Sequence, residues 1–265
     1  MRSLKLAVTT SRSQTTDLVC QARQIARKLA VPYIGRGDCS LEAIAAALEV
    51  EGIVVVSPQR VACVTRAGEF FFHPSLAMLR IKELNNGKTD QMIEAMSIGP
   101  GNTVLDCTMG LGTDAIVASF VTGACGRVVG LENSEIIAFL VNRGIAAFPE
   151  SDRDIATALR RVQVIPVDHR EYLRMLPPGS FDVVYFDPMF RLPRRKSPAI
   201  NVMRTLADPD SLERETIRLA LKVAVKRVVV KEGRDSSELR RLGFNNVLGG
   251  RYAPVVYGVM DGQGV

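Results

Sequence analysis

The feature that most constrains the fold is a regular alternation of strand-like and helix-like segments after residue 103. The strand-like segments are short and rich in Val, Leu and Ile, and they lie at 103–107, 127–131, 161–166, 182–186 and 227–231. Helix-like stretches lie between them, near 114–122, 134–147, 169–175 and 211–223. Nearly continuous apolar strands separated by helices are typical of a parallel sheet that helices cover on both faces. We therefore expect an α/β fold here.

The end of the chain breaks this alternation. Residues 243–248 and 255–260 have the pattern of two strands, joined by the turn sequence Gly-Gly-Arg-Tyr-Ala-Pro. Two strands joined in this way place an antiparallel hairpin beside an otherwise parallel sheet. We expect a Rossmann-like, mostly parallel sheet of seven strands with a C-terminal antiparallel hairpin, an arrangement that dehydrogenases usually lack.

The first third of the chain has the pattern of a small α/β unit. Strands are expected at 4–9, 53–56 and 61–65, and helices at 17–30, where apolar residues recur at helical spacing, and at 41–48 after Ser40, a suitable N-cap. Two changes in composition follow, at residues 83–103 and in the Pro- and Arg-rich segment 188–207. We expect a small N-terminal α/β domain at 1–72 and a larger domain at 73–265.

Composition excludes several classes of protein. The chain has 265 residues, 47% of them apolar and 23% charged, which argues against global disorder. No apolar run approaches the roughly 20 residues that span a bilayer, and the N-terminus lacks the apolar stretch of a signal peptide. Its cysteines form no Cys-x-x-Cys pair and only two histidines accompany them, so we expect reduced thiols and no metal site; they are Cys20, Cys39, Cys63, Cys107 and Cys125. A cytoplasmic location is expected.

One loop carries the first candidate site. Residues 104–114, Val-Leu-Asp-Cys-Thr-Met-Gly-Leu-Gly-Thr-Asp, place Asp106 at the end of a buried strand and Gly110 and Gly112 before a helix. Glycines let the backbone approach a ligand closely, and the helix N-terminus offers free N–H groups. The pattern is not the dinucleotide motif Gly-x-Gly-x-x-Gly, because residue 108 is Thr and the third glycine is missing. By itself, the loop is equally compatible with an ordinary strand-to-helix turn.

Acidic residues also end the next two strands. Glu132 follows the second strand, and an acid there can accept hydrogen bonds from both hydroxyls of a ribose. Asp168 follows the third strand, where it can accept a hydrogen bond from the exocyclic amine of adenine. Because the carboxyl ends of parallel strands meet at one edge of a sheet, these acids and Asp106 predict a site for an adenosine-containing ligand.

A second motif, Asp187-Pro188-Met189-Phe190, follows the fourth strand. An aryl amine is a weak nucleophile because its lone pair is delocalised into the ring. Asp187, or backbone carbonyls of the same turn, could accept a hydrogen bond from such an amine, and Pro188 would stiffen the turn. Phe190 could stack on a base that has left its helical stack. An Asp-Pro turn with a core phenylalanine is the simpler alternative.

These motifs resemble those of class I S-adenosylmethionine-dependent methyltransferases. More narrowly, the chain resembles the bacterial small-subunit ribosomal RNA guanine-N2 methyltransferases of the J type. The residues that carry the resemblance lie at 106–114, 131–132 and 185–190, and the form Asp-x-Thr-x-Gly-Leu-Gly-x-Asp, with Thr where most methyltransferases have Gly, is fairly specific to that group. The resemblance covers about residues 70–260 and does not extend to the N-terminal unit.

The resemblance implies S-adenosylmethionine as the cofactor and a role for each matching residue. The first loop would line the methionine end of the cofactor, with Asp106, Thr108, Gly110, Gly112, Thr113 and Asp114. Glu132 and Asn133 would hold the ribose, and Asp168 and His169 the adenine side. Asp187 would lie between cofactor and substrate, in a catalytic turn with Pro188 and Phe190. The chain departs from the family at Asn133, where arginine is usual, and at Arg191, where proline is usual.

Basic residues gather directly after the catalytic turn. Residues 188–207 include no acid and five basic side chains, Arg191, Arg194, Arg195, Lys196 and Arg204. Such a loop could grip the phosphates on either side of a target base, although a charged loop is often simply solvated. His73 and Arg80, in the segment that bridges the two parts, are further candidates for RNA contact, and a structural hydrogen bond is the alternative for His73. The net charge of +6 permits a polyanionic partner.

We therefore expect a methyltransferase that acts on an exocyclic base amine in RNA, with guanine N2 of small-subunit rRNA as the favoured acceptor. Its partner would be that RNA or the small ribosomal subunit, and no membrane. Transfer would be direct and in line, without a metal. No cysteine lies in the turn at 187–190, which argues against C5 methylation of pyrimidines. The alternatives are another planar nitrogen acceptor (a DNA adenine or cytosine amine, tRNA, a protein amide) or an RNA-binding protein with this fold but no turnover.

Overall fold

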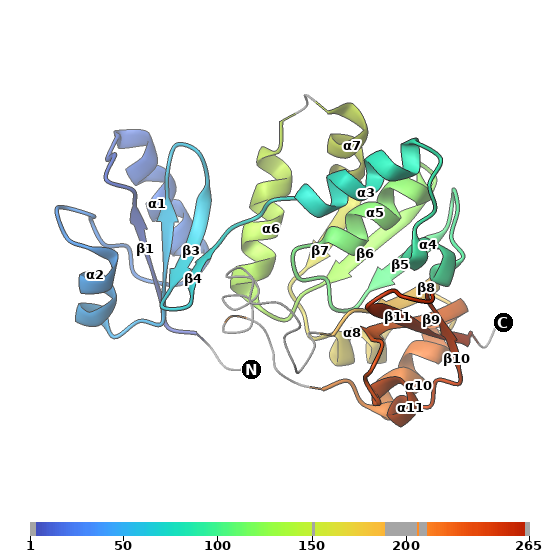
Figure 1. Cartoon of the computed structure of the whole chain (residues 1–265). Helices are drawn as coiled ribbons and strands as arrows, with labels where there is room; N and C mark the ends of the chain where they lie inside the picture. Colours follow the sequence, from blue (N-terminus) through green and yellow to red (C-terminus); the bar gives the residue numbers. More distant parts are fainter. Residues whose placement is uncertain (1–3, 150–151, 189–205, 207–210, 263–265) are drawn as a thin grey trace.

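The computed structural model describes residues 4–149, 152–188, 206 and 211–262. These residues form two α/β parts (Figure 1), one around a four-stranded sheet near the N-terminus and one around a seven-stranded sheet. The site residues predicted from the acidic strand ends belong to the larger part.

The large sheet has the strand order β10-β11-β9-β8-β5-β6-β7. Its strands are β5 (Thr103–Asp106), β6 (Arg127–Leu131), β7 (Val162–Ile165), β8 (Phe181–Phe186), β9 (Ala224–Gly233), β10 (Asn246–Leu248) and β11 (Val255–Asp261). Strands β9, β8, β5, β6 and β7, in this spatial order, each pair in parallel with the next. Strand β11 is antiparallel to both β9 and β10. The prediction of a mostly parallel seven-stranded sheet with a C-terminal antiparallel hairpin is confirmed.

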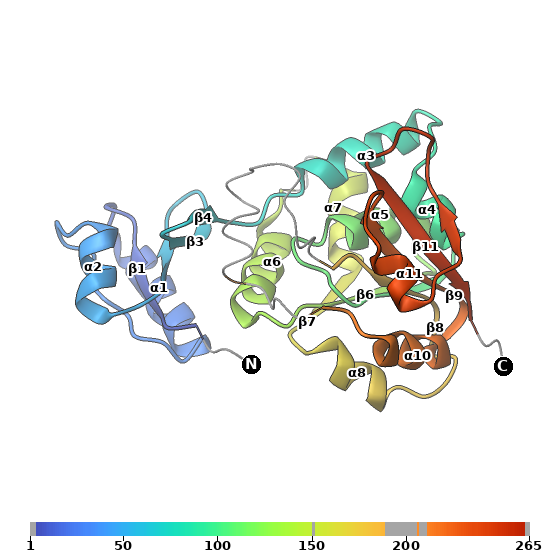
Figure 2. The same cartoon turned by 60° about the horizontal axis from the view of Figure 1, so that its bottom comes forward.

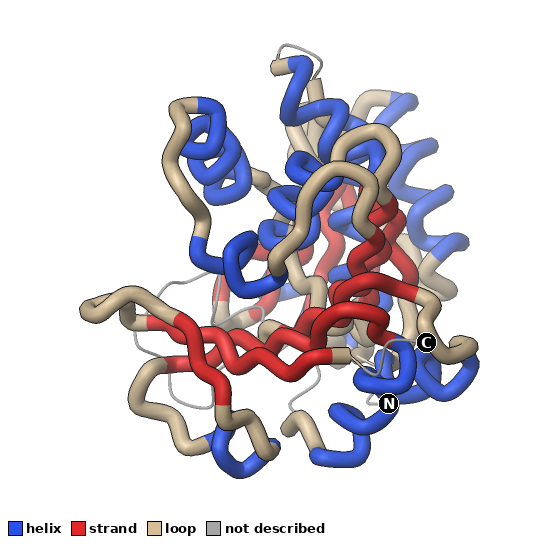
Figure 3. Tube along the Cα trace, turned by 90° about the vertical axis from the view of Figure 1, so that its right-hand side faces the viewer, coloured by secondary structure: helices blue, strands red, loops and turns tan. Residues whose placement is uncertain are grey.

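Helices cover both faces of this sheet (Figures 2 and 3). On one face lie α3 (Ser75–Asn85), α4 (Gln91–Met96), α5 (Thr113–Thr122), α6 (Glu135–Ala147) and α7 (Arg153–Arg161). On the other lie α8 (His169–Met175), α10 (Arg214–Val223) and α11 (Glu238–Leu242). Neighbouring strand residues alternate between the two cores, with Val104 in the first and Leu105 in the second. The strands are apolar throughout because both of their faces are buried.

Several elements of the larger part differ from the sequence-based expectation. Residues 83–103, expected to separate the two parts, contain α4, which contacts β9 and β11 and buries Met92 and Met96. Asp90 begins this helix by accepting hydrogen bonds from the backbone N–H groups of Met92 and Ile93. Helices α3, α7 and α11 were not predicted, and β9 is longer than expected. Six residues are too few for α4 to show a helical repeat of apolar positions.

The small part contains a sheet of strand order β1-β2-β3-β4, made of β1 (Leu6–Thr10), β2 (Gly52–Val56), β3 (Val61–Thr65) and β4 (Gly68–Phe70). Helices α1 (Thr16–Lys28) and α2 (Leu41–Leu48) lie in the crossover that parallel pairing of β1 with β2 requires. Thr15 and Ser40 cap the two helices. The predicted helices and the β2–β3 hairpin are confirmed, and β4 is an addition.

The two parts meet along α6, which stands between the small sheet and the large one (Figure 1). Arg143 of α6 donates a hydrogen bond to Gln21 of α1 over 2.9 Å, and the Lys28 ammonium lies 5.5 Å from the centre of the Phe139 ring. Apolar residues of both parts belong to one continuous core. We propose the domain boundary between residues 72 and 73, where the chain passes from β4 towards α3. In the described part of the chain, no helix is both long and apolar enough to cross a membrane.

Candidate active site

The carboxyl ends of β5, β6, β8 and β9 lie side by side and bring together residues from distant parts of the chain. Asp106 is the last residue of β5, and its register partners are Gly130 on β6 and Tyr185 on β8. Glu132 follows β6, and Asp187 follows β8. The acids expected at one edge of the sheet were Asp106, Glu132 and Asp168. Asp106 and Glu132 end neighbouring strands, Asp168 follows β7, the neighbour of β6, and Asp187 joins them from β8.

Thr108 joins the loop after β5 to the turn after β8. Its hydroxyl accepts a hydrogen bond of 2.6 Å from the backbone N–H of Asp187, and its own N–H donates to Oδ1 of Asp106 over 3.1 Å. The backbone N–H of Cys107 also donates to the carbonyl of Tyr185. A glycine at position 108, the residue usual in methyltransferases, would lack this hydroxyl. Thr108 therefore connects the loop after β5 to the turn that contains Asp187.

The two glycines of the loop adopt backbone conformations that other residues rarely adopt. Gly110 has a φ of 53° and Gly112 a φ of 76°. A Cβ atom on Gly112 would also lie 2.6 Å from Cε of Met109, which packs over β6. Gly112 precedes α5 without a side-chain cap, so backbone N–H groups in the first turn, where Thr113 is the first residue, receive no cap from a side chain. An uncapped helix N-terminus can bind a carboxylate.

Glu132 is buried and held in one orientation by two backbone donors. Its Oε2 accepts a hydrogen bond from the N–H of Gly110 over 3.1 Å, and its Oε1 accepts one from the N–H of Ser134 over 2.7 Å. A carboxylate can accept further hydrogen bonds, so these contacts orient Glu132 without using all of its capacity. Asn133 lies next to it, between β6 and α6.

Asp168 begins α8 and is paired with Arg170. It accepts a hydrogen bond of 2.7 Å from the backbone N–H of Arg170, and the Arg170 guanidinium contacts both of its carboxylate oxygens. Hydrogen bonds from this guanidinium lower the pKa of Asp168 to about 2. An adenine amine at Asp168 would share the carboxylate with Arg170. The ring of His169 lies edge-on to Phe186, with 5.8 Å between the ring centres.

A buried network of charges lies beside these residues. Asp114, the second residue of α5, accepts hydrogen bonds from the guanidinium of Arg80, from the Tyr185 hydroxyl over 2.7 Å and from the Lys231 ammonium over 3.0 Å. The same ammonium lies 2.7 Å from Oδ2 of Asp187. Asp114 was predicted to line the methionine end of the cofactor, but the structure turns its carboxylate towards this network.

Lys231 was not among the predicted site residues. It lies near the end of β9, directly after the apolar run Val228–Val230. The acids were identified because each is a charged residue at the end of an apolar strand. The same criterion, applied to this strand, would have identified Lys231.

The environment of each carboxylate sets its charge. Burial and the negative charge of Asp114 together raise the pKa of Asp187 to about 6, although the Lys231 ammonium lowers it. Burial also acts on Asp114, but the cations of Lys231 and Arg80 outweigh it and hold the pKa of Asp114 below its ordinary value. Asp106 has a pKa raised well above its ordinary value by burial and by the charge of Asp114.

Two residues predicted to contact RNA lie between β4 and α4. His73 is exposed just before α3. The guanidinium of Arg80 pairs with both carboxylate oxygens of Asp90, at 2.7 and 2.9 Å, and also with Asp114, so it points into the network. RNA contact by these two residues stays a prediction, and the geometry of Arg80 does not support it. Pro188 is half-buried, and the remaining predicted residues fall outside the described part of the chain: Phe190, Arg191, Arg194, Arg195 and Lys196.

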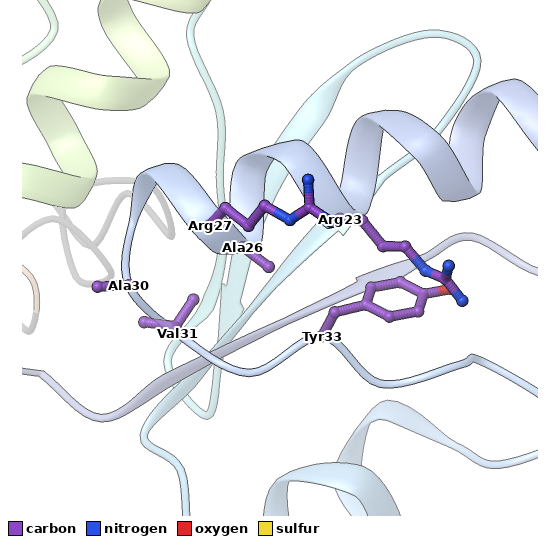
Figure 4. A pocket seen from close by; sticks show the side chains of 6 residues that line it. All are labelled: Arg23, Ala26, Arg27, Ala30, Val31 and Tyr33. Carbon is purple, nitrogen blue, oxygen red and sulfur yellow. The ribbon is translucent and has the colours of Figure 1, made fainter.

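A separate hollow lies on the small part, away from the carboxylates (Figure 4). Its volume is about 470 Å³, and it is lined by residues of α1 and the following segment: Arg23, Ala26, Arg27, Ala30, Val31 and Tyr33. The guanidinium of Arg23 lies over the Tyr33 ring, 5.4 Å from its centre. None of the residues predicted to bind the cofactor lines this hollow.

Comparison with known proteins identifies the family. Residues 71–249 match the model of a family described as "Putative SAM-dependent methyltransferase". A relative from Bacillus subtilis, described as "Uncharacterized protein YpiP", is 37% identical over 255 residues, which cover 96% of this chain and 98% of the relative. The chain belongs to this family of S-adenosylmethionine-dependent methyltransferases.

More distant relatives and a solved structure are similar to this methyltransferase. Two relatives are named ribosomal RNA small subunit methyltransferase J. The protein from Hydrogenovibrio crunogenus is 31% identical over 60% of this chain, and the protein from Pseudomonas syringae is 36% identical over 58% of it. The chain spans 58% of the length of each. A crystal structure of an S-adenosylmethionine-dependent methyltransferase from Neisseria gonorrhoeae has a TM-score of 0.65 at 18% identity, and the match covers 98% of this chain and 97% of that one. The predicted class I methyltransferase fold and the predicted cofactor are confirmed.

The residues at the sheet edge fit the groups of S-adenosylmethionine. The uncapped start of α5 can receive the carboxylate of its methionine end, and the left-handed conformations of Gly110 and Gly112 leave no side chain in the way. Glu132 presents an oriented carboxylate for the ribose hydroxyls. The chemistry of this donor and acceptor set therefore suits the cofactor of this methyltransferase. The individual roles, including those of Asn133 and His169, remain predictions.

Proposed function

We propose that this methyltransferase transfers a methyl group to an exocyclic base amine in RNA, and that the acceptor is guanine N2 of small-subunit rRNA. The observation that carries the proposal is the position of Asp187. Its carboxylate follows β8 at the same sheet edge as Asp106 and Glu132, and its backbone is tied to the cofactor loop through Thr108. The names of the J-type relatives and the net charge of +6 support RNA as the substrate.

When bound, S-adenosylmethionine would supply a methyl group on a positively charged sulfur. The lone pair of the amine would attack the methyl carbon, the electrons of the carbon–sulfur bond would stay on sulfur, and the methylated amine would then lose its extra proton to water. In this proposal Asp187 accepts a hydrogen bond from the amine N–H and so draws electron density towards the nitrogen. An ionised Asp187 is a stronger acceptor than a protonated one, which keeps acceptor capacity but carries a donor hydroxyl. Its side chain is 29% exposed, so a substrate can reach it, whereas the side chain of Asp114 is 9% exposed.

The experiment uses purified protein, S-adenosylmethionine with a labelled methyl group, and small ribosomal subunits from a strain that lacks the gene. The rRNA is digested to nucleosides, and the labelled product is identified by its mass. We expect label in N2-methylguanosine, and a loss of rate of about 100-fold in Asp187→Ala because the fixed acceptor is removed. Asp261→Ala, which changes an exposed aspartate at the end of β11, is the matched control and should leave the rate unchanged.

Other results would contradict specific parts of the proposal. Label in a different nucleoside would overturn guanine N2, and label in DNA or protein that resists RNase would overturn RNA as the substrate. Full activity of Asp187→Ala would show that Asp187 is not the acceptor. No transfer to subunits or naked rRNA, despite measurable cofactor binding, would overturn the rRNA assignment.

A further inference from the structure

Lys231 links two carboxylates that differ in their exposure to solvent. Its Nζ lies 2.7 Å from Oδ2 of Asp187 and 3.0 Å from Oδ2 of Asp114. The Lys231 side chain is 20% exposed, between the 9% of Asp114 and the 29% of Asp187. The ammonium therefore bridges an interior carboxylate and one that a substrate can reach.

Asp114 is a firm anchor for this bridge. It receives donors from three elements, Arg80 on α3, Tyr185 on β8 and Lys231 on β9. Arg80 is itself held by Asp90, the residue that begins α4. Because the anchor is fixed from three directions, the ammonium and the Asp187 oxygen that it contacts have little freedom to move.

We propose that Lys231 is a positioning residue for methyl transfer, whose ammonium, anchored on Asp114, keeps the Asp187 carboxylate ionised and in one place. The proposal rests on the proposed function in one respect, namely that Asp187 is the group that meets the acceptor amine. It gives β9, an element with no residue in the predicted site, a part in the reaction.

Electrostatics explains why a cation is needed there. Burial and the nearby charge of Asp114 both favour a proton on Asp187, and Lys231 is the cation that opposes them. A protonated carboxyl group has one oxygen committed as a donor and is a poor acceptor for an amine N–H. Without Lys231, Asp187 would be protonated over more of the neutral pH range.

Several charged or titratable groups surround this pair and belong in any account of its titration. They are Asp106 on β5, Asp114 on α5, Tyr185 on β8, Tyr257 on β11, which is paired in register with Lys231, and Arg80 on α3. Of these, Asp114 acts most directly on Asp187, and it acts in the direction opposite to Lys231. Changes at the two positions should therefore shift the titration of Asp187 in opposite directions.

The first test measures this titration without any substrate. In protein with carbon-13-labelled aspartate, the carboxyl signal of Asp187 is assigned from its absence in Asp187→Asn and followed by NMR as a function of pH. The wild-type midpoint is expected at about pH 6. In Lys231→Met it should rise by about one unit or more, because the nearby positive charge is lost, and in Asp114→Asn it should fall, because the like charge is lost.

Lys226→Met is the matched control. Lys226 lies on the same strand and pairs with a different aspartate, Asp182, over 3.2 Å, with its side chain 45% exposed. Its replacement should leave the Asp187 midpoint unchanged. Circular dichroism checks that each variant is folded, and if Lys231→Met does not fold, Lys231→Gln, which removes the charge but keeps a polar side chain, takes its place. An Asp187 midpoint that does not change in the folded variants would overturn the proposal.

The second test is single-turnover methyl transfer to the acceptor that the nucleoside analysis identifies. Lys231→Met should lower the rate by about 100-fold, as expected for a reacting group that is displaced. The acidic limb of its pH–rate profile should move to higher pH, whereas a purely structural loss would lower the rate without moving that limb. If the wild-type protein fails to methylate rRNA, the proposed function is wrong, but the NMR comparison still decides the role of Lys231.

Discussion

The buried carboxylate of Asp114 makes the stability of the protein depend on the side chains that donate hydrogen bonds to it. The Tyr185 hydroxyl donates a hydrogen bond of 2.7 Å to it, and both residues are buried. We expect Tyr185→Phe to lower the free energy of unfolding by about 1.5–3 kcal/mol, the usual range for a hydrogen bond to a charged group. Urea unfolding measures this loss.

A control separates the hydrogen bond from the aromatic ring. Tyr172→Phe changes a half-buried tyrosine on α8 and should stay within about 0.5 kcal/mol of the wild type. Equal effects of the two substitutions would show that the Tyr185 hydroxyl contributes nothing specific.

Glu132 provides a second prediction at this scale. Replacement by alanine removes the carboxylate proposed to meet the ribose and leaves the N–H groups of Gly110 and Ser134 without their acceptor. We expect Glu132→Ala to weaken S-adenosylmethionine binding by about 10-fold or more, since each charge-assisted hydrogen bond contributes about 1.5–3 kcal/mol. Isothermal titration calorimetry measures the dissociation constant. The exposed Glu135, three residues later, is the control, and a similar loss in Glu135→Ala would contradict the assignment.

Residue types at the ends of strands could be predicted from sequence, but their partners could not. The acids at positions 106, 132 and 187 stood out because each follows an apolar strand. The orientation of Asp114 depends on Arg80 and Lys231, which are 34 and 117 residues away in the chain. No local sequence pattern encodes contacts between residues so far apart in the chain, so the charge network could be found only in the structure.

Helix α6 forms the contact between the two parts, and its Gly144 permits it. A Cβ atom at position 144 would lie 2.2 Å from Cδ1 of Phe72, in the segment that leaves the small sheet. Alanine favours a helix over glycine by about 1 kcal/mol, yet we expect Gly144→Ala to destabilise the protein by about 1–3 kcal/mol through overpacking. Thermal or urea unfolding measures the net effect.

A double-mutant cycle tests the cause. Phe72→Ala removes the ring that the new methyl group would meet, so the double variant should lose less stability than the sum of the two single changes. Additivity within about 0.5 kcal/mol would show that the two positions do not interact.

At the scale of elements, the sequence predicted some short segments to the residue. Helix α2 and strands β3 and β6 have the bounds that the sequence predicted. Helix α4 was missed because six residues show too little periodicity. Its stability comes from the cap at Asp90 and from burial of Met92 and Met96 against the large sheet.

At the scale of the whole molecule, the raised pKa of Asp187 makes the free energy of unfolding depend on pH. Asp187 has an ordinary pKa of 3.8 and a folded value of about 6, so between these values the folded state binds a proton that the unfolded state has lost. Stability from this group therefore falls as pH rises from about 4 to about 6 and then stays level.

Asp187→Asn removes this titration. The difference in unfolding free energy between the wild type and this variant therefore shows whether Asp187 makes stability fall or rise with pH. The unfolding free energy of the wild type minus that of Asp187→Asn should decrease from about pH 4 to about pH 6 and be constant above. Denaturant unfolding at a series of pH values measures it. A difference that increases with pH over this range would mean that folding lowers the pKa of Asp187.

The parallel sheet with its closing hairpin, the glycines of the loop and the acids at the strand ends could all be predicted from the amino-acid sequence. These features are encoded within a few neighbouring residues, through the alternation of apolar segments and the backbone freedom of glycine. The inward orientation of Asp114 and the contact of Lys231 with both Asp114 and Asp187 could be seen only in the folded chain. The physical reason is that electrostatic pairing depends on distance in space, and the fold brings these residues together from widely separated positions in the chain.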